Sequence, residues 1–240
     1  MKNLFIRFFL FYFVLSPLWA SNLIIATIAN APPFEFQNDA KGLSGFDIDL
    51  MNDLCKRMNT RCKFKIYEFS QVLPALKRGE VDLAIAAIDI TPQRKEQFLF
   101  SLPYKLANIK IVTLTTSDLQ TPNQLVNKHI GFYKNAPDKD YLNALSLQQI
   151  HAQYYPHVAD LFAALKQKEV DAIVVEPSRA AYWLANNQGF KVLGKSVSVA
   201  EGYGIAANLN QNELIEEINH YLKQMERDGT YLQIYNRYFK

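Results

Sequence analysis

Apolar positions along this chain follow two different spacings, which predict strands that alternate with helices. Leu23–Ile28 is an apolar, β-branched run, and Val81–Ile88 is a nearly continuous apolar run typical of a strand buried on both faces. Phe46–Met58 has the spacing of an amphipathic helix, with Asp47 and Asp49 in its first turns, where the helix dipole favours acids. Strands alternating with helices indicate parallel α/β sheets.

The same patterns predict the other elements. Lys63–Phe69 alternates polar and apolar residues and is expected to be a strand, with Ser70 capping the next helix. Thr91 and Pro92 are expected to be the cap and the first residue of a further helix. The other expected strands are Ile109–Leu114, His129–Tyr133, Val170–Glu176 and Gly202–Ala207, and the other expected helices are Pro177–Trp183, one from about Asn212, and Tyr231–Phe239 after a break at Asp228-Gly229.

One block of sequence occurs twice. Ala75–Ile85 reads ALKRGEVDLAI, and Ala164–Val174 reads ALKQKEVDAIV. Each copy has the pattern of a helix end, a turn, a Val-Asp pair and an apolar strand. The copies are too far apart for a solenoid, so they predict two similar α/β lobes. Chance similarity between two common helix–strand units is the alternative.

The two predicted strands end in residues that suit a ligand site, because ligands of α/β sheets bind at the carboxyl ends of strands. Ala87, Ile88 and Asp89 follow the first copy, and Glu176 follows the second. No low-complexity linker separates the lobes, so the chain is expected to cross between them near 107–111 and near 197–203. Two such crossings form a hinge.

The N-terminus has the pattern of a secretory signal peptide. The basic residues Lys2 and Arg7 precede the wholly apolar run Phe8–Val14, and Leu18-Trp19-Ala20 provides a cleavage site after Ala20. The run is too short to span a membrane. The expected divisions are therefore a signal peptide at 1–20, a first lobe at 21–108 plus 200–240, and a second lobe at 109–199.

Charge and cysteine content narrow the class of protein. Without residues 1–20 the 26 basic residues fall to 24 against 23 acidic ones, a net charge of +1, which does not favour nucleic acid. Cys55 and Cys62 are the two cysteines of the chain, and in an exported protein they are expected to form a disulfide. A continuous helix would place their Cα atoms roughly 10 Å apart, so the helix must end near Asn59-Thr60. A free buried pair or half of a metal site is the alternative, and no cofactor is expected.

Six short motifs together carry a family resemblance. They are, in chain order, Pro33-Phe34-Glu35-Phe36, Gly45-Phe46-Asp47-Ile48-Asp49-Leu50, Leu54-Cys55-Lys56-Arg57 with Cys62, Ala87-Ile88-Asp89-Ile90-Thr91-Pro92-Gln93-Arg94, Phe100-Ser101-Leu102-Pro103-Tyr104 and Asp228-Gly229-Thr230-Tyr231. In this order they resemble the periplasmic amino-acid-binding proteins of ABC importers over essentially all of 22–240. The cysteine spacing and the Asp-Ile-Thr-Pro string resemble the branch that binds arginine, histidine, lysine and ornithine. The resemblance implies two α/β lobes that close over one amino acid, a type II periplasmic-binding-protein fold.

The resemblance also implies roles for individual residues. Arg94 would bind the ligand carboxylate through its planar guanidinium, aided by backbone N–H groups near Asp89 and Thr91. Glu176 would accept the ligand ammonium, and Phe69 would stack on a guanidinium. Asp89 would pair with a cationic side chain, cap the helix, or do both. The alternatives are a surface position for Arg94, a solvated loop for Glu176 and a purely structural core position for Phe69.

Three departures from the family pattern leave the ligand open. Ala31 replaces an aromatic that often stacks on the ligand, and Ile28 replaces an acid that often faces its side chain. The Gly-Thr-Thr-type loop of the second lobe appears as Asn135-Ala136-Pro137, and Pro137 has no N–H to donate. Asp138 follows, facing either ligand or solvent. Tyr133 and Tyr203 are candidates to replace the lost aromatic surface.

The sequence therefore predicts a periplasmic, monomeric receptor that binds an amino acid, with arginine favoured, and delivers it to a membrane permease. It is not expected to be an enzyme. The first alternative is an enzyme on the same scaffold, such as a cyclohexadienyl-type dehydratase, with Glu176 or Asp89 as general acid or base. The second alternative is a sensor module, which would need the same ligand.

Overall fold

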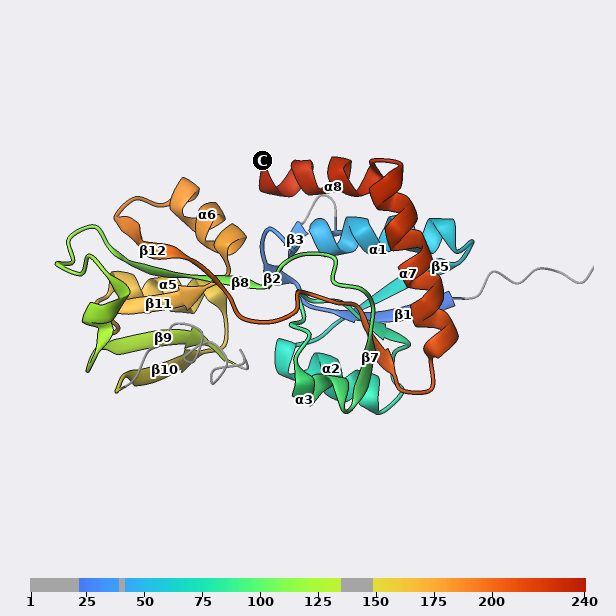
Figure 1. The fold of residues 1–240 in the computed structure, drawn as a ribbon, viewed down its shortest axis with the longest axis horizontal. Coiled ribbons are helices and arrows are strands. Elements are labelled where there is room, and N and C mark those ends of the chain that lie inside the picture. Colours follow the sequence, from blue (N-terminus) through green and yellow to red (C-terminus); the bar gives the residue numbers. More distant parts are fainter. Residues whose placement is uncertain (1–21, 39–41, 135–148) are drawn as a thin grey trace, which may run out of the picture.

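The computed structural model describes residues 22–38, 42–134 and 149–240 and shows two α/β lobes side by side (Figure 1). The signal peptide and cleavage site expected at 1–20, together with Pro137 and Asp138, lie outside the described residues. No helix of the described residues is long and apolar enough to cross a membrane. Within the same residues, no cluster of three or more His, Cys, Asp or Glu side chains is placed to hold a metal.

The first lobe is built on a sheet with the strand order β5-β1-β6-β13-β7. Its strands are β1 (Asn22–Thr27), β5 (Arg61–Ile66), β6 (Leu83–Ala84), β7 (Phe98–Phe100) and β13 (Ala206–Asn208). A small antiparallel sheet beside it consists of β2 (Asn30–Ala31), β3 (Glu35–Asn38) and β4 (Gly42–Ser44). The helices of this lobe are α1 (Phe46–Arg57), α2 (Phe69–Lys77), α3 (Pro92–Lys95), α7 (Asn212–Arg227) and α8 (Thr230–Phe239).

The second lobe has the strand order β10-β9-β11-β8-β12. Its strands are β8 (Asn108–Leu114), β9 (His129–Tyr133), β10 (His151–Tyr155), β11 (Ala172–Val175) and β12 (Phe190–Ser198). Its helical elements are the 3-10 helix η1 (Pro122–Leu125), α5 (Val158–Lys166) and α6 (Pro177–Asn186). In both lobes the first three strands of the order are parallel, and the fourth is antiparallel to the strands on either side of it. In this order β1 corresponds to β9 and β6 to β11. The prediction of two similar α/β lobes is confirmed.

Each sheet buries both faces. In the first lobe, Phe46, Leu50 and Leu54 of α1 pack with α7 and α8 on one face, and Val72 and Leu76 of α2 pack on the other. In the second lobe α5 and α6 cover one face, while the segment around η1 covers the other. Cover on both faces explains why the central strands are apolar runs with little alternation, whereas the edge strands β5 and β10 keep exposed positions.

Three predicted elements are wrong in their bounds. The run Val81–Ile88 is buried almost throughout, but only Leu83–Ala84 is strand, because the chain turns at Ala87 with φ +46°. The strand predicted to reach Phe69 ends at Ile66, and Phe69 instead begins α2 after the N-cap Glu68, so Ser70 lies inside the helix. The strand expected at Gly202–Ala207 begins at Ala206, with isolated bridges at Tyr203 before it.

The predicted disulfide is present. Cys55 in α1 is bonded to Cys62 in β5, with Cα atoms 6.0 Å apart. The helix ends at Arg57, and Asn59 has φ +51°. The N–H of Thr60 donates to the Cys55 carbonyl at 2.9 Å, which closes the turn that the spacing required.

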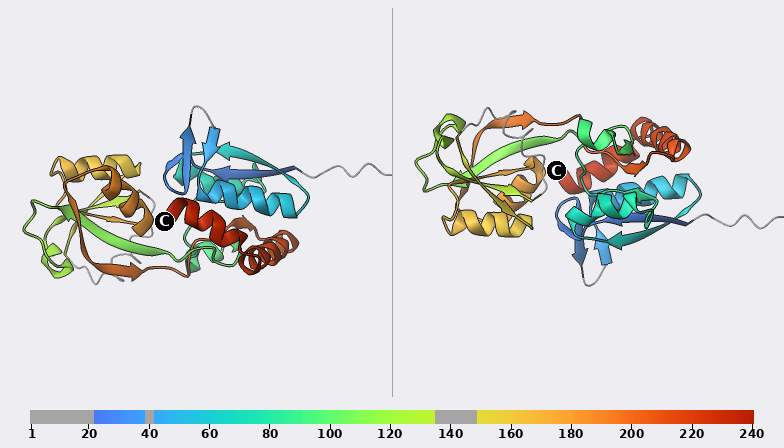
Figure 2. Two further views of the ribbon diagram at one scale, coloured as in Figure 1. Left: turned by 90° about the horizontal axis from the view of Figure 1, so that it is seen from above. Right: turned by 90° about the horizontal axis from the view of Figure 1, so that it is seen from below.

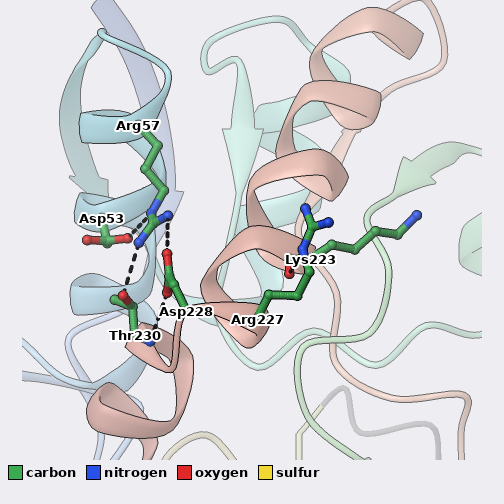
Figure 3. Close-up of polar contacts among 6 residues, drawn as sticks. All are labelled: Asp53, Arg57, Lys223, Arg227, Asp228 and Thr230. Atoms are coloured by element: carbon green, nitrogen blue, oxygen red, sulfur yellow. Dashed lines mark hydrogen bonds and ion pairs between the residues drawn. The ribbon is translucent and has the colours of Figure 1, made fainter.

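Arg57 ties the end of α1 to the junction of α7 and α8 (Figure 3). Its guanidinium bonds Asp53 at 2.5 Å, Asp228 at 2.8 Å and the Thr230 hydroxyl at 3.0 Å. Thr230 bonds and the Arg57 charge lower the pKa of Asp228 to about 2. Gly229, with φ +80°, provides the left-handed residue between the helices. The C-terminal helices are thereby fixed to the first lobe, and the end of α8 lies beside the second lobe (Figures 1 and 2).

Two paired extended segments connect the lobes. Asn108 pairs with Ser198 at the ends of β8 and β12, and the Val199 N–H donates to the Ala107 carbonyl. Closer to the first lobe, Tyr104 and Lys105 pair with Tyr203. A side chain at Gly202 would lie 2.5 Å from Pro103, so the close pairing requires glycine there. These segments run where the sequence predicted the crossings.

Candidate functional site

A pocket lies between the two lobes, at the carboxyl ends of β6 and β11. Its aliphatic wall comes from α5 and β11 of the second lobe. The residues with aromatic, charged or strand-end character that line it are Phe69, Ala87, Asp89 and Tyr203 on the first-lobe side, and Tyr133, Glu176 and Arg179 on the second-lobe side. Six residues that the sequence offered as candidates thus meet in one pocket, namely Phe69, Ala87, Asp89, Tyr133, Glu176 and Tyr203.

The first-lobe wall is held in an unusual backbone conformation. Ala87 has φ +46°, a left-handed value that costs energy for a residue with a Cβ atom. Its N–H donates to Oδ2 of Asp47 at 2.8 Å, and the hydroxyl of Tyr104 donates to the same oxygen at 2.9 Å. The Gly204 N–H donates to the Ile88 carbonyl at 3.0 Å. Asp47 therefore fixes the backbone that carries Ala87 into the pocket.

Asp47 adjoins a second buried acid, Glu35. Both side chains are fully buried. Burial raises the pKa of Glu35 well above its ordinary value, and the neighbouring Asp47 charge raises it further. Burial also raises the pKa of Asp47, although hydrogen bonds from Ala87 and Tyr104 oppose the shift. Two carboxylates this close do not both ionise readily, so the neutral acid form is favoured for Glu35.

Arg94 lies next to this wall. Thr91 caps α3 as predicted, accepting from the Arg94 N–H at 3.3 Å. Nη1 of Arg94 donates to the Asp89 carbonyl oxygen at 2.9 Å and lies 3.8 Å from the Asp89 carboxylate. Arg94, Phe69 and Ile88 line a hollow adjoining the pocket between the lobes. Arg94 therefore holds the backbone at Asp89 and lies in a hollow beside the pocket.

Glu176 ends β11 and is the N-cap of α6. Its Oε2 accepts from the backbone N–H groups of Ser178 at 2.7 Å and Arg179 at 2.9 Å. Its Oε1 accepts from Nζ of Lys105 at 2.8 Å and from the Ser178 hydroxyl at 3.1 Å. A carboxylate has about four acceptor positions, so these four bonds use the whole capacity of Glu176. The ion pair ties the second lobe to the segment that joins the lobes.

Aromatic rings complete the contact between the lobes. Phe69 meets Tyr133 edge to face, with ring centroids 5.5 Å apart. Nζ of Lys105 lies 5.5 Å from the Phe34 ring centre and 5.0 Å from that of Phe239. Phe34 belongs to the first lobe, and Phe239 ends α8. The ring of Phe69 therefore lies where the two lobes meet.

Two of the three departures from the family pattern, Ala31 and Ile28, lie in the described residues. Ala31 is 2% exposed and packs in the core beneath β1 and α2, away from the pocket. Ile28 is also buried and borders a shallow hollow with Phe69 and Tyr133. Tyr203, proposed as replacement aromatic surface, lines the pocket as Tyr133 does.

Sequence reasoning missed four charged residues of the site. Asp47 was assigned to the helix dipole from its place in the first turn, and Glu35 appeared only as part of a motif. Lys105 and Arg179 received no role. The burial of Asp47 and Glu35, and the position of Lys105 and Arg179 at the junction of the lobes, depend on contacts between segments far apart in the chain. Only the low frequency of fully buried acids and arginines makes them stand out, and that appears in the structure alone.

Comparison with known proteins identifies the family. The family model of the bacterial extracellular solute-binding proteins, family 3, matches residues 23–240. The chain belongs to this family. The resemblance inferred from the motifs is thus confirmed.

Individual relatives agree with the family. The ABC transporter arginine-binding protein 1 of Escherichia coli strain K12 is 29% identical over 243 residues, which cover 100% of this chain and 99% of the relative. A crystal structure of an arginine transport-system periplasmic binding protein from Legionella pneumophila is 38% identical, with a TM-score of 0.86, and the match covers 92% of this chain and 100% of that one. An ancestral amino-acid-binding protein, a precursor of cyclohexadienyl dehydratase, is 26% identical with a TM-score of 0.82 over 92% and 96% of the two chains.

Proposed function

We propose that this solute-binding protein is an exported, monomeric periplasmic receptor that binds one amino acid between its lobes and delivers it to an inner-membrane ABC permease. The observation that carries the proposal is a pocket with charged and aromatic side chains from both lobes, at the carboxyl ends of matching strands. The signal peptide at 1–20 would be cleaved after Ala20, and the moving units would be 21–108 plus 200–240 and 109–199.

Arginine is the first ligand to test. The Escherichia coli relative and the Legionella pneumophila structure both carry arginine in their names. Phe69 in the cleft supplies a flat ring on which a guanidinium can stack. Arg94 is proposed to bind the ligand α-carboxylate, because a guanidinium matches two carboxylate oxygens. The carboxylate of Asp89 would face the cationic groups of the ligand.

Glu176 is proposed to bind the ligand ammonium by exchange of partners. In the described structure Lys105 Nζ occupies one of the acceptor positions of Glu176. An ammonium group on the ligand has the same charge and the same donors as Nζ, so it can take this position when Lys105 withdraws. Binding then links Glu176 of the second lobe to a ligand held by the first, and this contact favours the closed state.

A thermal-shift screen of the mature protein against the common amino acids, with ornithine and citrulline, tests the function. A ligand at 100 times its Kd adds about 2.7 kcal/mol to stability, or roughly 5–10 °C for a chain of this size. A shift with arginine supports the proposal as stated. Shifts with uncharged amino acids alone would reject arginine and keep the receptor. The absence of a shift with any amino acid would reject the receptor.

The role of Arg94 has its own test. Arg94→Ala is expected to weaken amino-acid binding at least about 100-fold in calorimetry, because charged hydrogen bonds to a carboxylate are worth about 1.5–3 kcal/mol each. Its circular dichroism should match the wild type. Unchanged affinity would exclude Arg94 from ligand binding.

A dehydratase on the same scaffold is the second candidate. The structural likeness to a dehydratase precursor and the buried Lys105–Glu176 pair at the pocket favour it. A carboxylate that accepts four hydrogen bonds is, however, poorly arranged to donate a proton. Incubation with a cyclohexadienyl carboxylate distinguishes the two candidates, because loss of water from it would establish catalysis.

A further inference from the structure

Arg179 is a buried cation whose guanidinium has no acceptor among the described residues. It is 8% exposed, lies in the first turn of α6, and lines the pocket between the lobes. Within the described part of the chain its Nε has no hydrogen-bond partner, and its guanidinium takes part in no hydrogen bond or ion pair. A buried guanidinium normally satisfies its five N–H donors, because burying a charged group without partners is costly.

Aromatic rings hold this guanidinium between the lobes. Its Cζ lies 5.3 Å from the ring centre of Phe34 in the first lobe and 5.9 Å from that of Tyr133 in the second. A ring face attracts a cation but offers no oxygen to the N–H groups. The rings therefore fix the position of the cation while its donors remain available to another molecule.

The nearby acids do not supply the missing acceptors. Glu176 is already saturated by Lys105, Ser178 and backbone N–H groups. Glu35 is fully buried beside Asp47, and its raised pKa favours the neutral form. Burial opposes the charge of Arg179, but nearby groups, among them Tyr203 and Glu176, raise its pKa. The guanidinium is thus charged, positioned and without an acceptor at the pocket wall.

Arg94 provides an instructive contrast. Its Nη1 already donates to the carbonyl oxygen of Asp89, and it borders the adjoining hollow. Arg179 borders the pocket between the lobes itself. We propose that Arg179 binds a carboxylate group of the ligand from the second lobe. This inference rests on the proposed receptor function and adds a second arginine to ligand recognition.

Two carboxylates fit this chemistry, the α-carboxylate of any amino acid and the side-chain carboxylate of a dicarboxylic one. Both offer two coplanar oxygens to a planar fork. The two carboxylates predict different results when a series of ligands is compared. An α-carboxylate contact serves arginine, glutamine and glutamate equally, whereas a side-chain contact serves glutamate alone.

The experiment is calorimetric titration of wild type, Arg179→Met and Arg179→Lys with arginine, arginine amide, glutamine, glutamate and succinate. Methionine keeps an unbranched chain against the two rings but removes the charge and donors. We expect Arg179→Met to bind about 10- to 100-fold more weakly than wild type, with Arg179→Lys intermediate because it keeps charge without the fork. Arg78→Met, a half-exposed arginine at the end of α2, is the matched control and should bind as wild type.

The outcomes separate the two proposals. Equal losses for all α-amino acids, with arginine amide insensitive to the substitution, support an α-carboxylate contact. A loss confined to glutamate and succinate supports a side-chain contact.

Arg179→Met with wild-type affinities would overturn the inference and leave the receptor proposal standing, with Arg179 serving only in packing. Wild type that binds succinate but no amino acid would overturn the receptor proposal, and the variant would then report on Arg179 with succinate. Wild type that binds none of these would overturn both.

Discussion

The two copies of the repeated block form the same local structure. In each copy the aspartate of the Val-Asp pair bonds to the backbone of the neighbouring parallel strand. Oδ2 of Asp82 accepts from the Ile24 N–H at 2.8 Å, and Oδ2 of Asp171 accepts from the His129 N–H at 2.8 Å. The aspartate N–H groups donate back to the Ile24 and His129 carbonyls. The repeated block therefore makes the same pair of hydrogen bonds in both lobes, and these bonds join β1 to the residues before β6 and β9 to the residues before β11.

The copies differ where their strands end. Ala87 and Glu176 occupy equivalent positions, and both line the pocket. At Ala87 the chain takes a left-handed conformation that Asp47 fixes from α1. At Glu176 the chain passes directly into α6, and Glu176 caps that helix. The shared part builds the lobe, and the divergent ends give the pocket a backbone wall on one side and a charged wall on the other.

The largest effect is expected from Asp47→Ala. It leaves the N–H of Ala87 and the hydroxyl of Tyr104 buried without an acceptor, so we expect a loss of about 3 kcal/mol in the free energy of unfolding and weaker ligand binding. Urea unfolding and calorimetry measure the two effects. Asp49→Ala is the matched control two residues along α1, because Asp49 bonds Arg237 and Tyr238 near the surface. A control that costs as much as Asp47→Ala would show that the buried anchor is unimportant.

Much of the fold could be predicted because it depends on local pattern. The run of apolar residues at His129–Tyr133, the cap at Thr91 and the break at Asp228-Gly229 are each visible within a few residues. The repeated block also made the presence of two similar lobes predictable. Where the local pattern was ambiguous, as at Phe69, tertiary contacts decided, and the residue begins a helix rather than ending a strand.

The site was only partly predictable, because its polar contacts join distant segments. Asp47 stands forty positions from the N–H that it holds. The dipole explanation for Asp47 uses only its own helix and could not reveal burial. Arg179 follows a proline and a serine at a helix start, a pattern typical of the surface, but Phe34 of the first lobe and Tyr133 of the second lie against its guanidinium. Residues at the ends of predicted strands were found because strand ends have a fixed place in the fold.

Glu35 makes the first-lobe wall sensitive to pH. Folding raises the pKa of Glu35 well above its ordinary 4.5, so the folded state binds a proton that the unfolded state loses more readily. Stability from this group is complete below about pH 4.5 and falls as the pH rises toward the folded-state pKa. Glu35→Gln removes the titration and keeps a donor for Asp47. We expect Glu35→Gln to gain stability over wild type as the pH rises, by about 1.4 kcal/mol per unit of raised pKa.

Unfolding of wild type and Glu35→Gln between pH 4.5 and 9 measures this difference. Wild type and variant with parallel stability profiles would show that Glu35 is not proton-bound in the folded protein. If the stability advantage of Glu35→Gln over wild type grew as the pH fell, the pKa of Glu35 would be lowered by folding and the side chain would be ionised.

A matched pair of substitutions tests whether the repeated block is equivalent in the two lobes. Asp82→Ala and Asp171→Ala each remove one acceptor from a strand N–H, and we expect each to cost about 1–1.5 kcal/mol. Asp171→Ala should cost the smaller amount, because His129 is exposed and water can replace the lost acceptor. Chemical denaturation gives both values. A cost near zero for one variant alone would show that the copies share sequence without sharing a structural role.

The smallest effects concern the turn of the repeat, where the copies differ at two positions, Arg78/Gln167 and Gly79/Lys168. Gly79 has φ +71° and the equivalent Lys168 has φ +62°, both left-handed. A Cβ atom at Gly79 would meet no atom within 4 Å, so Gly79→Ala should lose about 1 kcal/mol through the backbone alone. Lys168→Gly should gain about 0.5–1 kcal/mol by the same reasoning, which thermal unfolding would show as a rise of a few degrees. Changes of the same sign in both variants would mean that the two turns, despite their shared angles, are stabilised by different contacts.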